Sequence, residues 1–427
     1  MPKSQNRKIK NTVRYFLLLV CALFFFFLSN DFGLIDIQKT AIVMAVGVDR
    51  EDDVFIVTSQ IAVPQSSKQG KSTQTVQIVS RGNTVAQAFE EINAKTGWYP
   101  KLVFCRLIIL GEKTAEQNTF DALDFFLLDE YISDNCLLVT CDGTAKDLLN
   151  VTALIDPSGS VAMQKVLSPH AERVGAVLPT TLREFAIGYF SDSRSSYMPI
   201  LKTQPQQEQI GSNDSQGGGG GSQGGEQQNG GGNSGQNGQS SGAQSEQGGG
   251  QQGGQTQDKP VFSASETALF LAGKRVGTLT KDETFAFGAV KSKLRLASYS
   301  VKDNDGAYTL TVKRNTPKTK FKVGADNRAI YKIELTMTAG LLDYSKALSL
   351  HEGADAGDLP QSVFDNAEKR LVGQIKRVFE KCRVANCDIF ELTADLQKTE
   401  KKRYLALRQQ ILENALLEVS VRFQNIR

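Results

Sequence analysis

Residues 41–63 read AIVMAVGVDREDDVFIVTSQIAV, in which two apolar, β-branched runs flank a short charged segment. Runs of this length and composition, separated by polar residues, are typical of neighbouring strands. We therefore expect Ala41 to Val48 and Phe55 to Val63 to form a strand pair joined by the turn Asp49 to Asp53. The first folded residues of the chain thus predict a β-sheet.

Helical and strand patterns alternate after this pair. The segment from Thr84 to Lys95 places Val85, Ala88, Phe89 and Ile92 on one helical face. The other expected elements of this half are strands over 102–110 and 136–140, and helices over 120–130, 144–150, 162–177 with an interruption at Pro169, and 182–190. This alternation predicts a mixed α/β domain over residues 34–203.

The composition changes abruptly at residues 204–259, which are rich in Gly, Gln, Ser and Asn and almost free of apolar side chains. Such a segment cannot bury a core, so we expect a disordered linker. It could be a tether between separate domains or a long surface loop. Its glycines do not predict a phosphate-binding loop, because no strand precedes them and no helix follows.

In residues 260–427 the sequence predicts strands that are buried on one face only. A hairpin is expected over 268–279, followed by a helix that starts near Lys281. The apolar positions that alternate with polar ones are Tyr308, Leu310 and Val312, then Tyr331, Ile333, Leu335 and Met337, and finally Leu417, Val419, Val421 and Phe423. A long helix is expected from an N-cap at Ser362 with Asp365, and its apolar stripe is Phe364, Ala367, Leu371, Ile375 and Val378. With a further helix over 402–412, this half is an α+β domain, a sheet covered by helices.

The whole chain has 427 residues, of which 40% are hydrophobic and 22% are charged, so it can bury two or more ordinary cores. The formal net charge is +3, but the first 14 residues alone carry more positive charges than this, so the remainder of the chain is close to neutral. The remainder therefore lacks the basic surface that nucleic-acid binding requires. Cys382 and Cys387 are close enough in sequence for a disulfide, although isolated buried thiols are the preferred interpretation.

A basic arm over residues 1–14 precedes the uninterrupted apolar run YFLLLVCALFFFFL, from Tyr15 to Leu28. The positive charges orient such a segment with its N-terminus in the cytoplasm, so the chain after Asp31 is expected outside. We predict a signal anchor over residues 15–30. Its membrane-contacting residues are Tyr15, Phe16, Leu17, Leu18, Leu19, Val20, Leu23, Phe24, Phe25, Phe26 and Phe27.

Two alternatives apply to this anchor. The run would span about 24 Å as a helix, which also suits a signal peptide. However, Leu28-Ser29-Asn30 offers no small-residue cleavage site, so an uncleaved anchor is favoured. Lipidation of Cys21 is disfavoured because Val20 precedes it and apolar residues follow it.

Residues that could carry chemistry are sparse. His170 and His351 lie in different halves and lack the spaced partners of a zinc or catalytic site, while Ser158-Gly159-Ser160 reads as a loop and helix N-cap. The paired carboxylates, which are expected to be solvated, are Glu90-Glu91, Asp129-Glu130, and Asp49 with Asp52-Asp53. We therefore predict no catalytic residue, no cofactor-binding residue and no metal ligand, and hence no enzyme.

Short segments in a fixed order resemble the Ger(x)C family, the C subunits of spore germinant receptors. In the first half they are Ala41-Ile42-Val43, Gly47-Val48-Asp49, Val57-Thr58-Ser59-Gln60 with Pro64, Gly82-Asn83-Thr84 with Ala88, Ile108-Ile109-Leu110-Gly111-Glu112 with Ala115, and Leu123-Asp124-Phe125-Phe126 with Asp129. In the second half they are Ala268-Leu269-Phe270, Gly273 to Thr280 with Glu283, Cys387-Asp388-Ile389-Phe390 and Val419-Ser420-Val421-Arg422. Their order covers nearly all of residues 36–427 outside the linker.

The resemblance implies a multidomain, extracytoplasmic, non-catalytic subunit on the inner spore membrane. Its implied partners are membrane lipid and two multi-spanning subunits, A-like and B-like, with which it senses nutrient germinants. Members of this family are typically lipoproteins, but the corresponding region here, Asn30-Asp31-Phe32-Gly33, has no cysteine. The peptide segment is therefore expected to replace the lipid. The sequence departs from the family pattern at two further places. Arg106 stands where members often have histidine, and the long linker is an insertion.

Four residues are candidate partner contacts: Asp49, Trp98, Tyr99 and Glu112. Trp98 and Tyr99 precede Pro100 in an expected loop, where they could instead cap the domain core. Two other functions compete with the receptor subunit. One is a free-standing cell-envelope module that binds a ligand or wall component through the groove between its domains, and the other is a secreted hydrolase.

Overall fold

The first hairpin is formed by β1 (Thr40–Glu51) and β2 (Val54–Val63), which pair antiparallel as expected. The turn between them is shorter than predicted, because Asp49 belongs to β1 and pairs with Ile56. Asp52, with a φ of 53°, takes the left-handed conformation that lets so short a turn close. The prediction that Asp49 belongs to the turn was therefore wrong.

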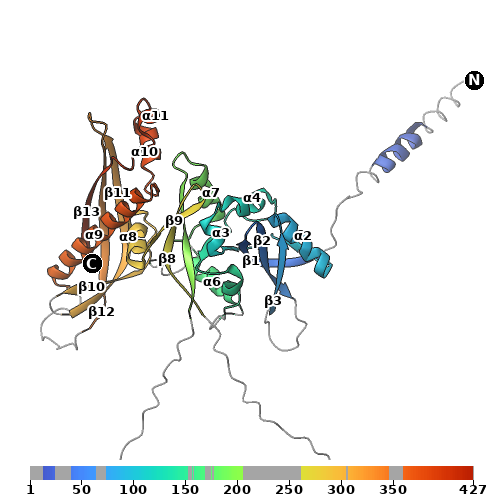
Figure 1. The fold of residues 1–427 in the computed structure, drawn as a ribbon, viewed down its shortest axis with the longest axis horizontal. Helices are drawn as coiled ribbons and strands as arrows, with labels where there is room; N and C mark the ends of the chain where they lie inside the picture. The colour runs from blue at the N-terminus through green and yellow to red at the C-terminus, as the bar shows by residue number, and fades with distance from the viewer. Residues whose placement is uncertain are drawn as a thin grey trace, which may run out of the picture.

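The computed structural model describes residues 13–24, 40–63, 74–151, 156, 158–168, 175, 177–204, 261–303, 306–345 and 359–426. Figure 1 shows two sheets side by side, with helices packed around them. The predicted α+β and mixed α/β class, with antiparallel pairs in sheets that helices cover, is confirmed. The rest of the predicted linker, 205–259, lies outside the described residues.

The first sheet has nine strands among the described residues, in the order β3-β2-β1-β5-β6-β7-β8-β9, with β4 paired to β1. The strands not yet introduced are β3 (Gln74–Gly82), β4 (Tyr99–Lys101), β5 (Leu107–Leu110), β6 (Leu137–Cys141), β7 (Ser195–Gln204), β8 (Val261–Leu271) and β9 (Lys274–Leu279). The central strands β1, β5, β6 and β7 run parallel, whereas the pairs at both edges are antiparallel.

Helices cover both faces of this sheet. They are α2 (Val85–Thr96), α3 (Glu112–Glu116), α4 (Phe120–Leu128), α5 (Ala145–Leu149), α6 (Gly159–Leu167) and α7 (Leu182–Phe190). Because neighbouring side chains of a strand point to opposite faces, Ile108 and Leu110 of β5 enter one core, while Leu107 and Ile109 enter another. A strand buried on both faces explains why β5 reads as a continuous apolar run.

Several expected elements of this half are confirmed. Thr84 caps α2 by accepting from the backbone N–H of Gln87, and α2 buries the predicted face. The predicted strand over 102–110 is too long, because only 107–110 pair with neighbouring strands. Leu102 and Cys105 are nevertheless buried, which explains why the apolar pattern extended the prediction.

The linker connects two strands that are neighbours in space. β7 and β8 pair antiparallel along their length, from Ser195 opposite Leu271 to Gln204 opposite Val261. The two ends of the linker therefore meet at one end of this strand pair, as Figure 1 shows. The residues that flank the linker therefore belong to one sheet and not to two separate ones. The strands β8 and β9, which follow the linker, complete the first sheet.

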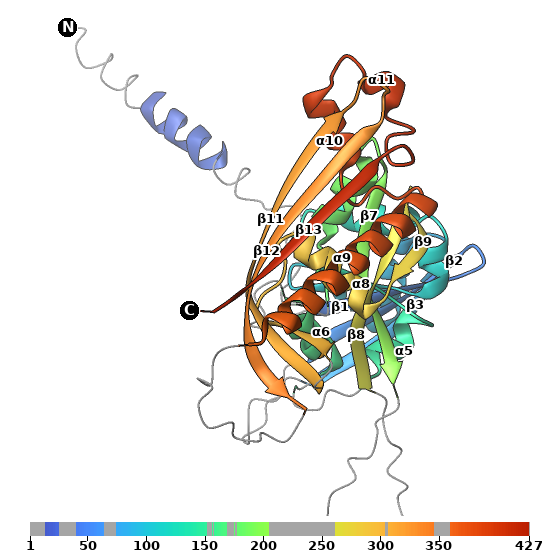
Figure 2. The ribbon, with the colours of Figure 1, turned by 90° about the vertical axis from the view of Figure 1, so that its left-hand side faces the viewer.

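The second sheet has the order β10-β11-β12-β13. Its strands are β10 (Ala297–Asp303), β11 (Gly306–Val323), β12 (Ala329–Tyr344) and β13 (Leu416–Asn425), and the associated helices are α8 (Lys281–Val290), α9 (Gln361–Val384), α10 (Leu392–Thr399) and α11 (Tyr404–Leu407). Figure 2 shows α9 lying across this sheet, where its predicted apolar stripe is buried in the largest core. β13 pairs parallel with β12.

Two helix predictions in this half were wrong. α9 begins after Pro360 without a side-chain cap, and the Ser362 hydroxyl instead donates to Asp303 at 2.7 Å. The helix expected over 402–412 is only the short α11, while α10 precedes it. Glu400 ends α10 with a non-helical φ of −128° and ψ of 53°, which separates the two segments.

Part of the predicted anchor forms a helix over residues 13–24, which stands apart from the sheets in Figures 1 and 2. Its apolar side chains are exposed, from 46% for Val20 to 71% for Tyr15. No helix within the described residues is long and apolar enough to cross a membrane. Phe25, Phe26 and Phe27 of the predicted anchor lie outside them, as does most of the arm over 1–14.

Candidate functional site

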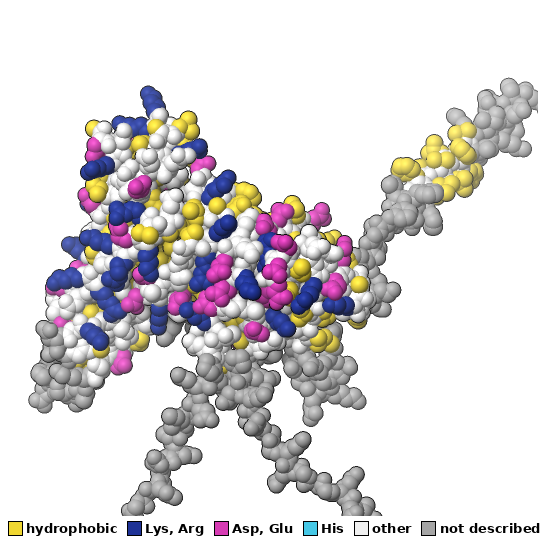
Figure 3. Space-filling view, in the orientation of Figure 1, with side chains coloured by type: hydrophobic (Ala, Val, Ile, Leu, Met, Phe, Trp, Pro, Cys, Tyr) yellow, Lys and Arg dark blue, Asp and Glu magenta, His cyan; other side chains and the backbone are white. Residues whose placement is uncertain are grey.

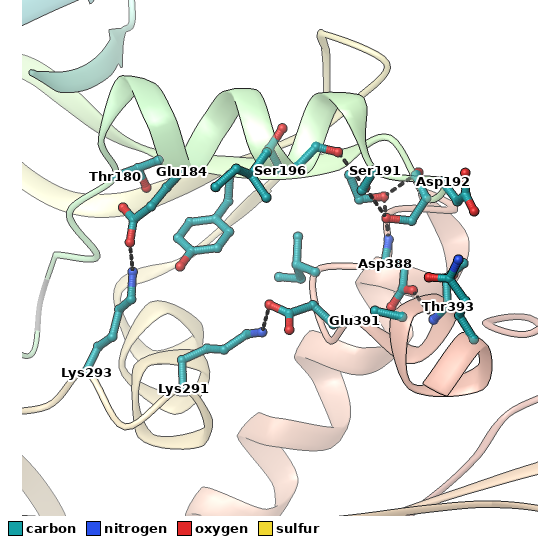
Figure 4. A pocket seen from close by; sticks show the side chains of 18 of the residues that line it. Thr180, Glu184, Ser191, Asp192, Ser196, Lys291, Lys293, Asp388, Glu391 and Thr393 are labelled. Atoms are coloured by element: carbon teal, nitrogen blue, oxygen red, sulfur yellow. Dashed lines mark hydrogen bonds and ion pairs between the residues drawn. The ribbon is translucent and has the colours of Figure 1, made fainter. Parts of the chain in front are cut away.

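A cavity of about 630 Å³ lies where the two halves of the chain meet. One wall comes from the first half, through Thr180, α7, the turn after this helix and the start of β7. The opposite wall comes from the segment after α8, the loop before α10, and α10 itself. Figure 4 shows these walls facing one another across the hollow. This is the groove between domains that the sequence suggested for a binding module.

Two ion pairs hold the charged side chains of the cavity. Lys291 Nζ lies 2.6 Å from Glu391 Oε1, within the second half. Lys293 Nζ lies 3.3 Å from Glu184 Oε1, so this pair joins the second half to α7 of the first. Burial alone would lower the pKa of Lys293, but Tyr197 and Glu184 beside it raise that pKa above its usual value. Lys293 therefore keeps its positive charge at neutral pH.

Aromatic and aliphatic side chains line the cavity between these pairs. Lys293 Nζ lies 5.5 Å from the centre of the Tyr197 ring, a cation–π distance. Burial raises the pKa of Tyr197, so its hydroxyl stays protonated and can donate. Ile187, Ile389 and Ala394 add apolar surface. The cavity thus combines charge, hydroxyl groups and an apolar wall.

Two buried hydroxyl groups of the lining have no partner. Thr180 is 3% exposed and Ser196 is 5% exposed, and neither Oγ1 of Thr180 nor Oγ of Ser196 makes a hydrogen bond with any described residue. A buried hydroxyl without a partner typically costs about 1–3 kcal/mol. Both side chains belong to the cavity lining, so a bound molecule could recover that cost.

Asp388 fixes the loop that forms one wall. It is 4% exposed, and its carboxylate accepts from the backbone N–H groups of Leu392 at 3.0 Å and Thr393 at 2.8 Å, at the start of α10. The backbone N–H of Asp388 donates to Ser195 Oγ at 2.8 Å. This residue therefore positions α10 and also attaches the second half to β7.

Sequence reasoning did not predict these cavity residues. They come from separate segments whose meeting depends on how the second half docks on β7. Asp388 and Ile389 lay in a segment named for the family resemblance, and neither was given a role. Neither the two lysines nor the two unpartnered hydroxyls form a recognisable pattern in the sequence.

The structure brings two of the predicted partner contacts together, away from the cavity lining. Asp49 is 8% exposed and accepts from the backbone N–H groups of Ala145 at 2.7 Å and Lys146 at 3.1 Å, while Glu112 accepts from that of Gly143 at 3.0 Å. Burial raises the pKa of Asp49. Both carboxylates thus hold the segment that leads into α5, which is a structural role. Whether either contacts a partner stays a prediction.

The other two predicted contacts, Trp98 and Tyr99, are 49% and 44% exposed. Tyr99 lines one shallow pocket together with Tyr131, which is also exposed. A role as caps of the core would bury them more fully. Their exposure leaves them accessible to a partner, and such a contact stays a prediction.

The remaining candidate residues have ordinary surroundings. Ser158 caps α6 by accepting from the backbone N–H of Val161, which confirms the loop and N-cap interpretation. Cys382 and Cys387 are buried free thiols. His170 and His351 lie outside the described residues. Within the described part of the chain, no group of three His, Cys, Asp or Glu side chains could hold a metal ion.

Comparisons with known proteins agree with this architecture. The sequence model "Spore germination protein N-terminal domain" matches residues 34–203, and "Spore germination B3/ GerAC like, C-terminal" matches residues 265–427. A search of curated proteins finds no match. The structure is similar to one titled "Crystal Structure of the GerBC protein", with a TM-score of 0.51 and 15% identity over 90% of this chain and 97% of that one. This structural likeness concerns the fold.

Replacement of Asp388 by Asn should change how stability depends on pH. Burial raises the pKa of Asp388 above its ordinary 3.8, so the folded protein keeps this proton to a higher pH than the unfolded chain does. As pH rises through that window, the unfolded state loses the proton first, and the contribution of Asp388 to stability falls. The free energy of unfolding of wild type, relative to Asp388→Asn, should therefore decrease as pH rises from the ordinary pKa of 3.8 to the raised pKa of folded Asp388.

Urea unfolding at a series of pH values measures this difference. Asp395→Asn is the matched control, because Asp395 lies on the same helix, α10, with a more exposed side chain. If the difference in unfolding free energy between wild type and Asp388→Asn stayed constant with pH, the raised pKa of Asp388 would be contradicted.

Proposed function

The chain belongs to the Ger(x)C family of spore germination proteins, and from this premise we propose that it is the membrane-anchored, non-catalytic C subunit of a germinant receptor. The observation that carries the proposal is the match of both family domains, in order, over residues 34–203 and 265–427. The proposed subunit acts on the outer face of the membrane, with A-like and B-like multi-spanning subunits as partners.

The exposed helix over residues 13–24 supports the proposed anchor. Its apolar side chains find no cover in the rest of the described chain, and burial of such side chains in lipid is favourable by roughly 25 cal/mol for each Å² removed from water. The basic residues before it favour insertion with the N-terminus inside. The folded halves then lie on the outer surface of the inner spore membrane.

The surface supports association with protein and lipid rather than with nucleic acid. Figure 3 shows Lys and Arg side chains interspersed with Asp and Glu over the face in view, without a continuous basic stripe. The exposed aromatic residues Trp98 and Tyr99 are suitable for contact with a membrane partner, because Trp and Tyr are enriched in the centres of protein interfaces.

A second candidate function is a free-standing envelope module that binds a ligand. The cavity between the halves is the observation that favours it. The two functions differ in their dependence on partners, since a free-standing module would be isolated alone from a native membrane. Neighbouring genes for multi-spanning transporter-like proteins would favour the receptor.

Co-purification tests the receptor role. Full-length protein solubilised with detergent from germination-competent spores should be recovered together with the A-like and B-like subunits. The variant Trp98→Ala with Tyr99→Ala should reduce that recovery several-fold, because interface aromatics carry a large share of binding energy. Leu405→Ala, at a 77% exposed apolar residue on α11, is the matched control and should change nothing. Recovery of the wild-type protein alone would contradict the proposal.

Mass spectrometry of the mature N-terminus tests the anchor. We expect an uncleaved and unlipidated chain that retains residues 15–30, because the segment offers no small-residue cleavage site. An N-terminus near Asn30, or a diacylglyceryl group on Cys21, would overturn the peptide anchor. Neither result would alter the two folded halves.

A further inference from the structure

Positive charge is distributed unevenly between the two halves of the chain. Residues 34–203 contain 15 Lys and Arg against 20 Asp and Glu, a net charge of −5, whereas residues 260–427 contain 28 against 20, a net charge of +8. Two short segments of the second half, 318–332 and 398–408, contain ten of these basic residues and only two acidic ones. They account for the whole positive excess of this half, so the excess is local.

The fold brings these two segments to the same end of the second sheet. The first segment forms the adjoining ends of β11 and β12 with the turn between them, and the second runs from the end of α10 through α11. Arg403 Nη1 donates to the carbonyl oxygen of Gly324 at 3.0 Å, which joins the start of α11 to this turn. Figures 1 and 2 show α10 and α11 beside these strand ends. We call residues 318–332 and 398–408 together the basic tip.

Most positive charges of the basic tip face solvent, and they outnumber the acidic residues around them. The exposed basic residues are Lys318, Lys320, Lys322, Arg328, Lys398, Lys401, Lys402 and Arg408. The ion pairs at the tip are Lys320 and Lys332 with Glu334, Arg328 with Asp326, Lys398 with Asp395, Arg403 with Glu400, and Arg408 with Asp192. The other four lysines form no ion pair with any described residue, so a positive excess remains.

The second segment combines this charge with an exposed apolar side chain and a hollow. Leu405 of α11 is 77% exposed, within four residues of Lys401 and Arg408. A hollow of about 460 Å³ is lined by Gln397, Lys398, Lys401 and Tyr404. This lining has two ammonium groups and no carboxylate, so it suits an anionic group such as a phosphate diester. Basic residues beside an exposed apolar side chain are typical of segments that lie on anionic membrane surfaces.

We propose that the basic tip is a second membrane contact of this chain, which binds the phosphate groups of anionic phospholipids. Lys398 and Lys401 hold a headgroup phosphate in their hollow, Leu405 enters the membrane interface, and the lysines without an ion pair attract the surrounding anionic surface. The proposal rests on the proposed anchor, which keeps the tip close to the bilayer and so raises its effective concentration there. The opposite net charges of the two halves favour an orientation with the second half toward the bilayer.

Fluorescence quenching by brominated phospholipids tests this contact in the full-length chain reconstituted into vesicles. Trp98, the sole Trp of the chain, is replaced by Phe and Leu405 by Trp, so that the only tryptophan reports on the tip. The vesicles contain either phosphatidylcholine alone or equal parts of phosphatidylcholine and phosphatidylglycerol, with the same brominated chains in both. The quenched fraction should be at least about fivefold larger with phosphatidylglycerol, because each basic residue near an anionic surface favours the contact by about that factor.

Salt and charge variants locate the contact. Raising the salt from about 0.1 M to about 1 M shortens the screening length from about 10 Å to about 3 Å and should abolish the difference between the vesicles. Lys401→Gln with Lys402→Gln should reduce the difference at least about fivefold. Lys369→Gln with Lys376→Gln, at two exposed lysines of α9 outside the tip, removes the same charge and should leave it unchanged.

Thermal unfolding confirms that each variant is folded, and Lys318→Gln with Lys322→Gln serves if the first pair of changes prevents folding. Equal quenching in both vesicles, quenching that salt does not change, or an equal loss in the α9 variant would overturn the proposal. Equal quenching together with loss of the A-like and B-like subunits from Lys401→Gln with Lys402→Gln would assign the tip to a protein partner instead.

Flotation of the chain with phosphatidylcholine vesicles measures the anchor by itself, whereas the difference in quenching measures the tip. A failure of the anchor can therefore be told apart from a failure of this proposal.

Discussion

The structure depends on the antiparallel pairing of β7 with β8, two strands that the long polar linker separates in sequence. Backbone hydrogen bonds join them from Ser195 opposite Leu271 to Gln204 opposite Val261. The pairing adds the first strands of the second half to the sheet of the first. Closing a loop of this length costs conformational entropy, so the paired strands must recover it through their hydrogen bonds and buried side chains. The apolar residues Met198, Ile200, Ala268 and Phe270 supply that burial.

The docking of the second half follows from this pairing. β9 leads directly into α8, and the largest core contains Leu178, Leu269 and Leu279 from the neighbourhood of the first sheet together with the residues of the second. The two halves therefore share a core. Their contact also leaves a hollow beside α7 and β7, which is where the ion pairs and unpartnered hydroxyls lie. The hollow is thus a consequence of how the chain closes its first sheet.

Much of the fold could be predicted from the sequence, because periodic burial leaves a direct pattern. The faces of α2 and α9 and the alternating positions of β11 and β12 are examples. The predictions failed where tertiary contacts override local signals. Ser362 bonds to Asp303 instead of capping its helix, and Leu102 and Cys105 are buried outside any strand. The cavity was beyond prediction in detail, since its residues meet only through the docking of the two halves, and Asp49 likewise contacts α5, distant in sequence.

Replacing residues 205–260 by an Asn-Gly turn tests the pairing of β7 with β8 most directly, with urea unfolding of the full-length protein as the readout. Each doubling of loop length costs about 0.6 kcal/mol, so the shortening removes nearly five doublings and should raise the stability by about 3 kcal/mol. We expect both halves to unfold together at a higher urea concentration than in the wild-type protein. Loss of the fold, or separate unfolding of the two halves, would contradict the account.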